Sequence, residues 1–321
     1  MIWRSESKIL NLKSEITNRY RSLVFRIYLA YFWRRNIGYI IMKESIKNEV
    51  KAIDIRNVIH SKSPKVARLI PGFVYRYINR ILHIEYINYV LKEYGQLQNL
   101  EFVEALIKDF KINPIINGLE NLPNEGRFIF ASNHPLGGFD GILLMDILGR
   151  RYKEIRFLVN DILLNLYPIK ELMIPINKHG AHSRDAAIKI EEAMASDKQI
   201  LTFPAGLVSR KIKGSIIDLE WKKNFIQKAV EHKRDVIPVH FSGRNTNWFY
   251  FVANLRKFMG IKWNLEMFYL VDETYKHRNM SVNVNFGKPM PWQTFDNSKN
   301  PKEWAEFVRA EVYSLQESTE R

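Results

Sequence analysis

The segment ASNHPLGGFDG, residues 131–141, contains residue types that together carry out acid–base chemistry. An imidazole such as that of His134 can take a proton from a hydroxyl group near neutral pH. A nearby carboxylate fixes the tautomer of the imidazole and stabilises the imidazolium, and Asp140 follows in the same segment. Because Gly137 and Gly138 permit positive φ angles, a sharp turn there would bring the two side chains together.

The same segment has a purely structural interpretation. Asn-His-Pro is typical of a turn, and an aspartate near the start of a helix commonly caps it. Taken alone, residues 131–141 favour that second interpretation. The choice between a catalytic pair and an ordinary turn therefore depends on the rest of the chain.

Two further segments carry groups that bind anions. FPAGLVSR, residues 203–210, follows an apolar run, and Arg210 with backbone N–H groups could hold a phosphate there. MIPINKHGAHSR, residues 173–184, adds Lys178 and Arg184 as candidates for the same pocket. Each segment alone is typical of a strand end with solvated charges.

The elements that would position these groups alternate in type after about residue 115. Apolar runs such as RFIFASN, IRFLVN, QILTFPAG and DVIPVHFSG alternate with helical segments such as GILLMDILGRRY and LEWKKNFIQKAVEHK. The late runs NLEMFYLV and VNVNFGKPM also have a strand-like pattern. We expect an α/β domain over 115–321, with a mixed, largely parallel sheet flanked by helices. In such sheets reactive groups gather at the carboxyl ends of strands, where His134 would lie.

The first part of the chain is basic and aromatic. Residues 1–83 hold 17 Lys and Arg against 5 Asp and Glu, a net charge of +12 out of +15 for all 321 residues. We expect a basic aromatic extension over 1–50 and a helical membrane-docking region over 51–114. The segment 22–41 carries three arginines, so it does not read as a transmembrane helix. It suits a helix at the headgroup level or a basic surface helix equally well.

The composition excludes several classes of protein. The chain has no cysteine, which rules out disulfides, thiol catalysis and cysteine-based metal sites. It lacks a P-loop, a dinucleotide fingerprint and the G-x-S-x-G elbow of serine hydrolases. His179 and His182 are more typical of a surface loop than of a metal site, and we expect no bound metal. A nucleic-acid-binding module would explain the charge, but no motif of that class is present.

Taken in their order, the segments resemble the glycerophospholipid acyltransferase superfamily, which includes lysophosphatidate and lysophospholipid acyltransferases. Asn133, His134 and Asp140 are similar to its Asn-His-x-x-x-x-Asp motif, with five residues in place of four between His and Asp. Lys178 falls where the basic second motif lies, and 203–210 resembles the Phe-Pro-Glu-Gly-Thr-Arg-Ser motif.

Two later segments extend this resemblance to about residues 115–292. IPVHFSGR, with Pro238, is similar to the hydrophobic fourth motif, and VNVNFGKPMP resembles the family's Phe-Gly-x-Pro strand. Ala205 replaces the glutamate of the third motif, and Leu207 and Val208 replace its Thr-Arg pair. These departures resemble a bacterial branch of acyltransferases for ornithine- and glycine-containing aminolipids.

The resemblance implies transfer of a fatty acyl group from acyl carrier protein or coenzyme A to the hydroxyl of a lysolipid. His134 would be the general base and Asp140 its orienting partner, with no other cofactor. Backbone N–H groups near Gly137, Gly138 or Gly206 would stabilise the oxyanion. The acceptor is either lysophosphatidate or a lyso-aminolipid. The substrate-contacting residues would be Asn133, Gly137, Gly138, Lys178, Arg184, Pro204, Gly206, Ser209, Arg210 and Pro238.

The resemblance also implies a membrane lipid surface as partner, at the cytoplasmic face of the inner membrane, and no nucleic acid. The alternative is a non-catalytic basic protein that binds membrane or nucleic acid. The aromatic, basic helix expected over 247–263 would line an acyl-chain groove, touch the bilayer or simply pack against the core.

Overall fold

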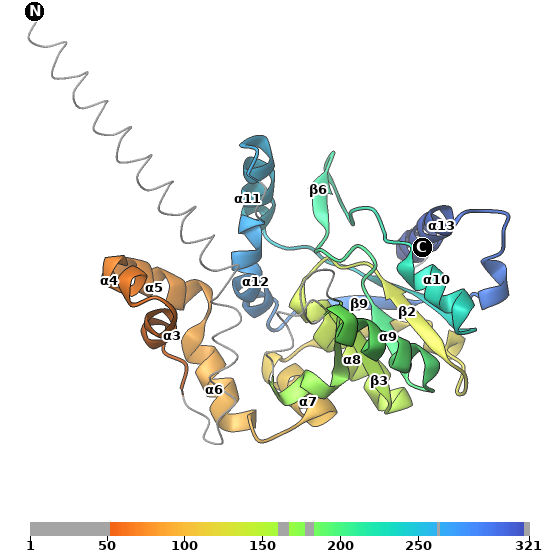
Figure 1. Ribbon diagram of the computed structural model, residues 1–321, viewed down its shortest axis with the longest axis horizontal. Helices are drawn as coiled ribbons and strands as arrows, with labels where there is room; N and C mark the ends of the chain where they lie inside the picture. The colour runs from red at the N-terminus through yellow and green to blue at the C-terminus, as the bar shows by residue number, and fades with distance from the viewer. Residues whose placement is uncertain (1–51, 160–166, 177–182, 262–263, 318–321) are drawn as a thin grey trace, which may run out of the picture.

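A computed structural model describes residues 52–159, 167–176, 183–261 and 264–317 (Figure 1). Its centre is a seven-stranded sheet of order β1-β9-β8-β2-β5-β3-β4. All neighbouring strands are parallel except β8 and β9, so β1 and β9 run opposite to the other five. The strands of this sheet are β1 (Asn113–Asn117), β2 (Phe128–Ser132), β3 (Ile155–Val159), β4 (Met173–Pro175), β5 (Gln199–Thr202), β8 (Asp235–Phe241) and β9 (Ser281–Phe286). Strands β6 (Arg210–Ile212) and β7 (Ser215–Ile217) form a separate hairpin.

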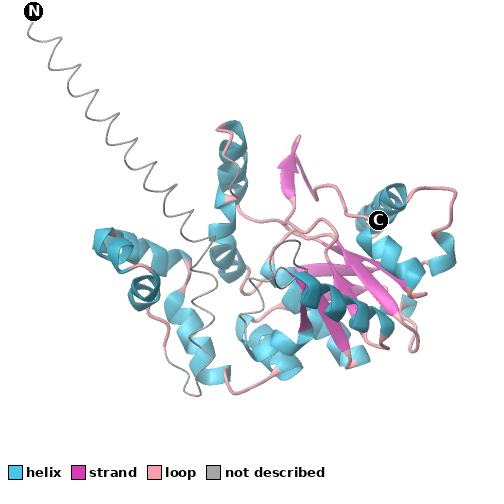
Figure 2. Ribbon diagram, in the orientation of Figure 1, coloured by secondary structure: helices cyan, strands magenta, loops and turns pink. Residues whose placement is uncertain are grey.

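Helices lie on both faces of this sheet (Figure 2). The helices of the described residues, on and beside the sheet, are α3 (Ile55–Lys62), α4 (Pro64–Leu69), α5 (Gly72–Ile81), α6 (Ile84–Tyr94), α7 (Asn99–Phe110), α8 (Gly138–Tyr152), α9 (Ser183–Ala195), α10 (Asn224–Glu231), α11 (Asn247–Phe258), α12 (Leu270–Lys276) and α13 (Pro301–Glu317). Short 3-10 turns are η3 (Leu119–Asn121), η5 (Tyr167–Leu172), η6 (Leu265–Tyr269) and η7 (Trp292–Thr294). The predicted class, a mixed and largely parallel sheet flanked by helices, is confirmed.

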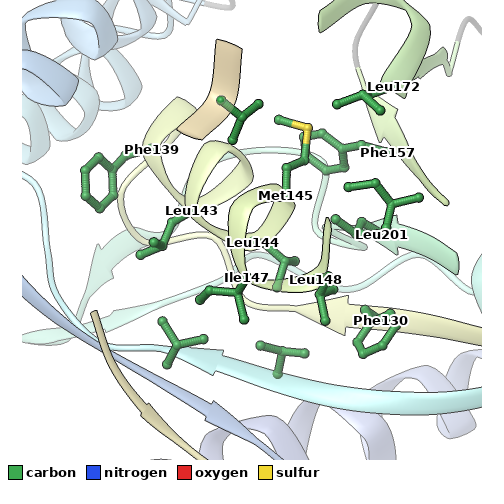
Figure 3. Close-up of a cluster of buried hydrophobic side chains, with 14 of the residues drawn as sticks. Phe130, Phe139, Leu143, Leu144, Met145, Ile147, Leu148, Phe157, Leu172 and Leu201 are labelled. Atoms are coloured by element: carbon green, nitrogen blue, oxygen red, sulfur yellow. The ribbon is translucent and has the colours of Figure 1, made fainter. Parts of the chain in front are cut away.

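The two faces of the sheet are covered by different helices because successive strand residues point to opposite sides. Along β2, Phe128 and Phe130 join the apolar side chains of α7 and α8. Figure 3 shows this cluster, with Leu143, Leu144 and Leu148 of α8 turned toward the strands. Ile129 and Ala131 face the other way and pack against α9, α10 and α13. The continuous apolar run of β2 is therefore that of a strand buried on both faces.

The helices before the sheet form two groups. Helices α3, α4 and α5 and the start of α6 enclose a cluster of their own. Helix α7, which the sequence grouped with them, instead packs its apolar side on α8 in the main core. No described helix is long and apolar enough to cross a membrane. The predicted extension over 1–50 lies outside the described residues.

One predicted strand is a helix. The run NLEMFYLV forms η6 and the first turn of α12. A short apolar run does not separate strand from helix by periodicity alone. Here Glu266, in the middle of the run, is fully buried and paired with Arg210 and Arg256. That contact fixes the segment against α11 rather than in the sheet.

Candidate active site

His134 and Asp140 meet at the end of β2. His134 Nδ1 lies 3.0 Å from Asp140 Oδ2, so the predicted pairing is present and the additional residue between them is accommodated. The His134 side chain is 16% exposed, whereas that of Asp140 is fully buried. With Nδ1–H donating to the carboxylate, Nε2 is the nitrogen left to accept a proton from a substrate. No residue of the described ranges hydrogen-bonds to it.

Asp140 also begins helix α8. Its Oδ2 accepts hydrogen bonds from the backbone N–H groups of Leu136 at 2.9 Å and Gly137 at 3.2 Å. Gly137 is the N-cap residue, with φ 82° and ψ −134°, a conformation that favours glycine. The predicted pairing and the predicted capping are thus both present, since one carboxylate oxygen caps the helix and contacts the imidazole. Burial raises the pKa of Asp140, and its hydrogen bond with His134 acts in the opposite direction.

The plane of the imidazole is set by Phe203. The two rings are stacked with centroids 4.1 Å apart and planes 14° apart. Phe203 is held in turn by an edge contact with Phe157 of β3. Phe203 is the first residue of the third motif, so this motif contacts His134 through an aromatic ring as well as through its loop.

Asn133 joins two strands and is not exposed to substrate. Its Nδ2 donates to the carbonyl of Phe241 at 2.9 Å, and its Oδ1 accepts from the N–H of Phe241 at 2.7 Å. The side chain is buried, and only an amide offers a donor and an acceptor in this arrangement. Asn133 therefore positions the end of β2 beside the end of β8, one residue before His134.

Asp218 is a site residue that the sequence did not reveal. It follows β7, is buried, and its Oδ1 accepts hydrogen bonds from the backbone N–H of His134 and from Ser209 Oγ. Its Oδ2 accepts from the indole N–H of Trp221 at 2.9 Å. The N–H of Ser209 donates to the carbonyl of His134 at 2.8 Å. Ser209 and Asp218 thus fix the backbone of His134, and burial raises the pKa of Asp218.

Arg210 points away from solvent into an ion pair. Its Nη2 lies 2.7 Å from Glu266 Oε1, and the guanidinium also donates to the carbonyl of Val208. Glu266 Oε2 lies 2.8 Å from Arg256 Nε. Arg210, predicted to hold a substrate anion, is therefore directed into a buried ion pair whose carboxylate it shares with Arg256. Desolvation lowers the pKa of Arg210.

The other predicted substrate contacts fall in several places. Pro204 is buried and its carbonyl accepts from the N–H of Lys222, while Gly206 is exposed with φ 68°. A Cβ at Gly206 would lie 2.5 Å from Lys222 Nζ, so this lysine lies at the third-motif turn. Pro238 lies within β8, paired with Ala131 and packed on Gly287. Arg184 is exposed at the start of α9.

Lys178, His179 and His182 lie outside the described residues. Elsewhere in the described ranges, Glu191, Glu231 and His232 are grouped closely enough to hold a metal ion. Lys228 already places its ammonium against both glutamates, at 2.5 Å and 2.7 Å. This group has no connection with the His134 site.

The backbone donors proposed for the oxyanion are partly occupied. The N–H of Gly137 donates to Asp140, and the N–H of Gly206 donates to the carbonyl of Phe203. Gly138 N–H, at the first position of α8, has no acceptor among the described residues. It also lies at the positive end of the helix dipole, where a developing oxyanion is favoured.

The family model of the acyltransferases matches residues 57–321. The chain belongs to the acyltransferase family. It is 47% identical over 264 residues to the lyso-glycine lipid O-acyltransferase of Bacteroides thetaiotaomicron, covering 82% of this chain and 97% of that relative. The enzyme of the same name from Phocaeicola vulgatus is also 47% identical, over 82% of this chain and 95% of the relative. The predicted superfamily and its aminolipid-like branch are confirmed.

Among solved structures, the chain is similar to the 1-acyl-sn-glycerophosphate acyltransferase PlsC of Thermotoga maritima. The TM-score is 0.44 with 17% identity, covering 76% of this chain and 96% of the other. Membership of the acyltransferase family supports an enzyme over the non-catalytic binding protein that charge alone allowed.

Proposed function

We propose that this acyltransferase esterifies the hydroxyl of a singly acylated glycine lipid with a fatty acyl group from an acyl thioester. The observation that carries the proposal is the 47% identity to two lyso-glycine lipid O-acyltransferases over nearly their whole lengths. The His134–Asp140 pair supplies the base that such a transfer requires.

The reaction would occur in one transfer without an acyl-enzyme intermediate. His134 Nε2 takes the proton of the acceptor hydroxyl as its oxygen attacks the thioester carbonyl. The new C–O bond forms, the C–S bond breaks, and the imidazolium returns the proton to the leaving thiolate. Asp140 keeps Nδ1 protonated throughout, and Gly138 N–H is the proposed donor to the oxyanion.

The third motif supports an aminolipid acceptor over lysophosphatidate. A phosphomonoester headgroup calls for strong, concentrated positive charge. Arg210 is paired with Glu266, and Ala205, where the superfamily has glutamate, lies in an apolar cluster with Trp221 and Phe225. Lys222 beside Gly206 is the proposed contact for the single carboxylate of a glycine headgroup.

The proposed partners follow from the two substrates. The acceptor lies in a membrane, so we propose peripheral association with the cytoplasmic face of the inner membrane, where acyl carrier protein and coenzyme A thioesters are present. Both donors are anionic, which suits the net charge of +15. No nucleic acid and no cofactor beyond the thioester enter the proposal.

The test is a competition between acceptors. The purified full chain would receive an acyl thioester and equal amounts of lysophosphatidate and singly acylated glycine lipid, with products identified by mass spectrometry. We expect the doubly acylated glycine lipid to dominate, and none to form with His134→Ala. Phosphatidate as the main product would contradict the proposed acceptor, and no product with either acceptor would contradict the proposed reaction.

A further inference from the structure

Helix α11 has two apolar faces, and only one of them is packed. Phe249 and Tyr250 are buried on Val208 beside the third-motif loop. The other face presents Trp248, Phe251, Leu255 and Phe258 to solvent, with Phe251 54% and Phe258 90% exposed. Their spacing of three and four residues places them on one side of the helix. Figure 1 shows α11 projecting beyond the sheet.

Helices α4 and α5 repeat this arrangement. Leu69, the last residue of α4, and Phe73 and Tyr77, four residues apart on α5, are all exposed, Phe73 to 64%. The opposite side of α5 packs Val74, Tyr75 and Ile78 into the cluster of the N-terminal helices. Large apolar side chains gathered on the solvent side form a contiguous patch, whereas single exposed residues scattered over a surface do not.

Tyr269 of η6 connects the two exposed faces. Its hydroxyl lies 2.8 Å from that of Tyr77 on α5. Its ring makes an edge contact with Trp248 of α11 at 5.9 Å, and Trp248 stacks on Phe251 at 5.7 Å. A hydrogen bond from α5 to Tyr269 and ring contacts from Tyr269 to α11 therefore connect two helices that are far apart in the sequence. We call Phe73, Tyr77, Tyr269, Trp248, Phe251 and Phe258 together the α5–α11 surface.

The charges on the two helical segments of this surface have one sign. Residues 64–81 and 247–258 contain no acidic residue, and their basic residues are Lys65, Arg68, Arg76, Arg80, Arg256 and Lys257. Arg256 is paired with Glu266, and the other five are exposed. Aromatic rings interleaved with exposed cations match an anionic bilayer, where rings enter the headgroup boundary and cations meet lipid phosphates. A second copy of the chain would bring like charges together.

We propose that the α5–α11 surface inserts into an anionic lipid bilayer, with α11 providing half of the contact. The choice of a lipid surface rests on the proposed function, whose acceptor resides in a membrane. Because the buried face of α11 packs on Val208, two residues from Arg210, the inserted helix would hold the third-motif loop close to the bilayer. Membrane docking then involves the catalytic domain and not the N-terminal helices alone.

Binding to vesicles tests the proposal without turnover. The full chain, a Trp248→Ser/Phe251→Ser/Phe258→Ser variant and an Ile188→Ser/Val230→Ser/Phe307→Ser control would be sedimented with phosphatidylglycerol vesicles. The control residues are exposed apolar side chains on α9, α10 and α13. We expect at least about tenfold weaker binding for the α11 variant and wild-type binding for the control. Circular dichroism would verify that each variant is folded, and equal binding by all three proteins would overturn the proposal.

The absence of cysteine permits a second, local measurement. Phe251→Cys, Phe258→Cys and Tyr77→Cys, with Ile188→Cys as control, would each carry a polarity-sensitive fluorophore. We expect a blue shift on adding anionic vesicles at the first three positions and none at position 188. A shift that follows protein concentration and not lipid would assign the surface to self-association and overturn the proposal. His134→Ala should bind vesicles like wild type, so failure of the proposed reaction would be distinguishable from failure of this surface.

Discussion

Asn133 holds the backbone of Phe241 through both atoms of its amide, 2.9 Å at the carbonyl and 2.7 Å at the N–H. Truncation in Asn133→Ala leaves both buried backbone groups without a partner. We expect a loss of about 2 kcal/mol or more in the free energy of unfolding, measured by urea denaturation. Asn133→Asp cannot donate to the carbonyl and should be destabilised as well. Wild-type stability of both variants would show that the amide does not join β2 to β8.

Gly137 and Gly138 should respond differently to the same substitution. Gly137 has a conformation that costs a residue with Cβ of order 1–3 kcal/mol, and its Cβ would lie 3.1 Å from Leu270. A Cβ at Gly138 would meet only Thr274 Oγ1, at 3.8 Å. We expect Gly137→Ala to lower both the stability and the activity, whereas Gly138→Ala, the matched control, should keep the stability of wild type. Thermal unfolding and acyl transfer rates would check this, and equal effects would contradict the assigned turn.

Asp140→Asn should lower the activity while the protein still folds. The Asn carbonyl, placed where Oδ2 lies, can still accept from the backbone N–H groups and from His134 Nδ1–H. It carries no negative charge, however, and so would not stabilise the imidazolium that forms during transfer. By analogy with the serine protease triad, we expect a loss of about 10³–10⁴ in turnover with the fold retained.

The stability of the same variant has a predicted pH dependence. Because burial raises the pKa of Asp140, the folded chain retains a proton that the unfolded chain releases near pH 3.9. The stability of wild type relative to Asp140→Asn should therefore fall as pH rises from about 4 to the raised pKa, and then level off. Urea denaturation between pH 4 and 8 measures this difference. A difference that grows with pH would contradict the sign.

His240 makes the fold sensitive to acid. It is buried in β8, and burial lowers its pKa from 6.5 to about 4. As the pH falls, the imidazole of the unfolded chain binds a proton at a higher pH than that of the folded chain. The free energy of unfolding is therefore unaffected by His240 above pH 6.5 and decreases as the pH drops toward 4. We expect the free energy of unfolding of wild type to decrease by up to about 3 kcal/mol over this pH range, relative to that of His240→Phe. Denaturant midpoints at pH 7 and pH 4 test this, and parallel behaviour of the two proteins would contradict it.

The sequence predicted the sheet and the contact between His134 and Asp140 because both depend on local pattern. Apolar runs bounded by turns located β2, β5 and β8, and the carboxyl end of β2 located His134. The contact with Asp140 followed from the two glycines of the turn, since the pair lies within one segment. Local spacing was sufficient for these features.

Residues that act across the fold were not predictable in this way. Asp218 reaches His134 only because the β6–β7 hairpin folds back, and a lone aspartate after a strand carries no signal of that. The sequence predicts Arg210 to be an anion-binding cation, because nothing local shows that Glu266, 56 residues later, lies beside it. Glu266 itself lay in a run that resembled a strand. In each case tertiary contact decides the role, and one sequence does not show it.

The central claim is that His134 is the base for acyl transfer, and turnover by His134→Ala tests it most directly. Initial rates with acyl thioester and singly acylated glycine lipid would be compared for wild type and variant, with vesicle binding and thermal unfolding as controls. We predict that the variant folds and binds vesicles like wild type while its turnover falls by at least about 10³. A folded variant that retains more than about a tenth of wild-type turnover would contradict the account, since general-base catalysis supplies at least about 10².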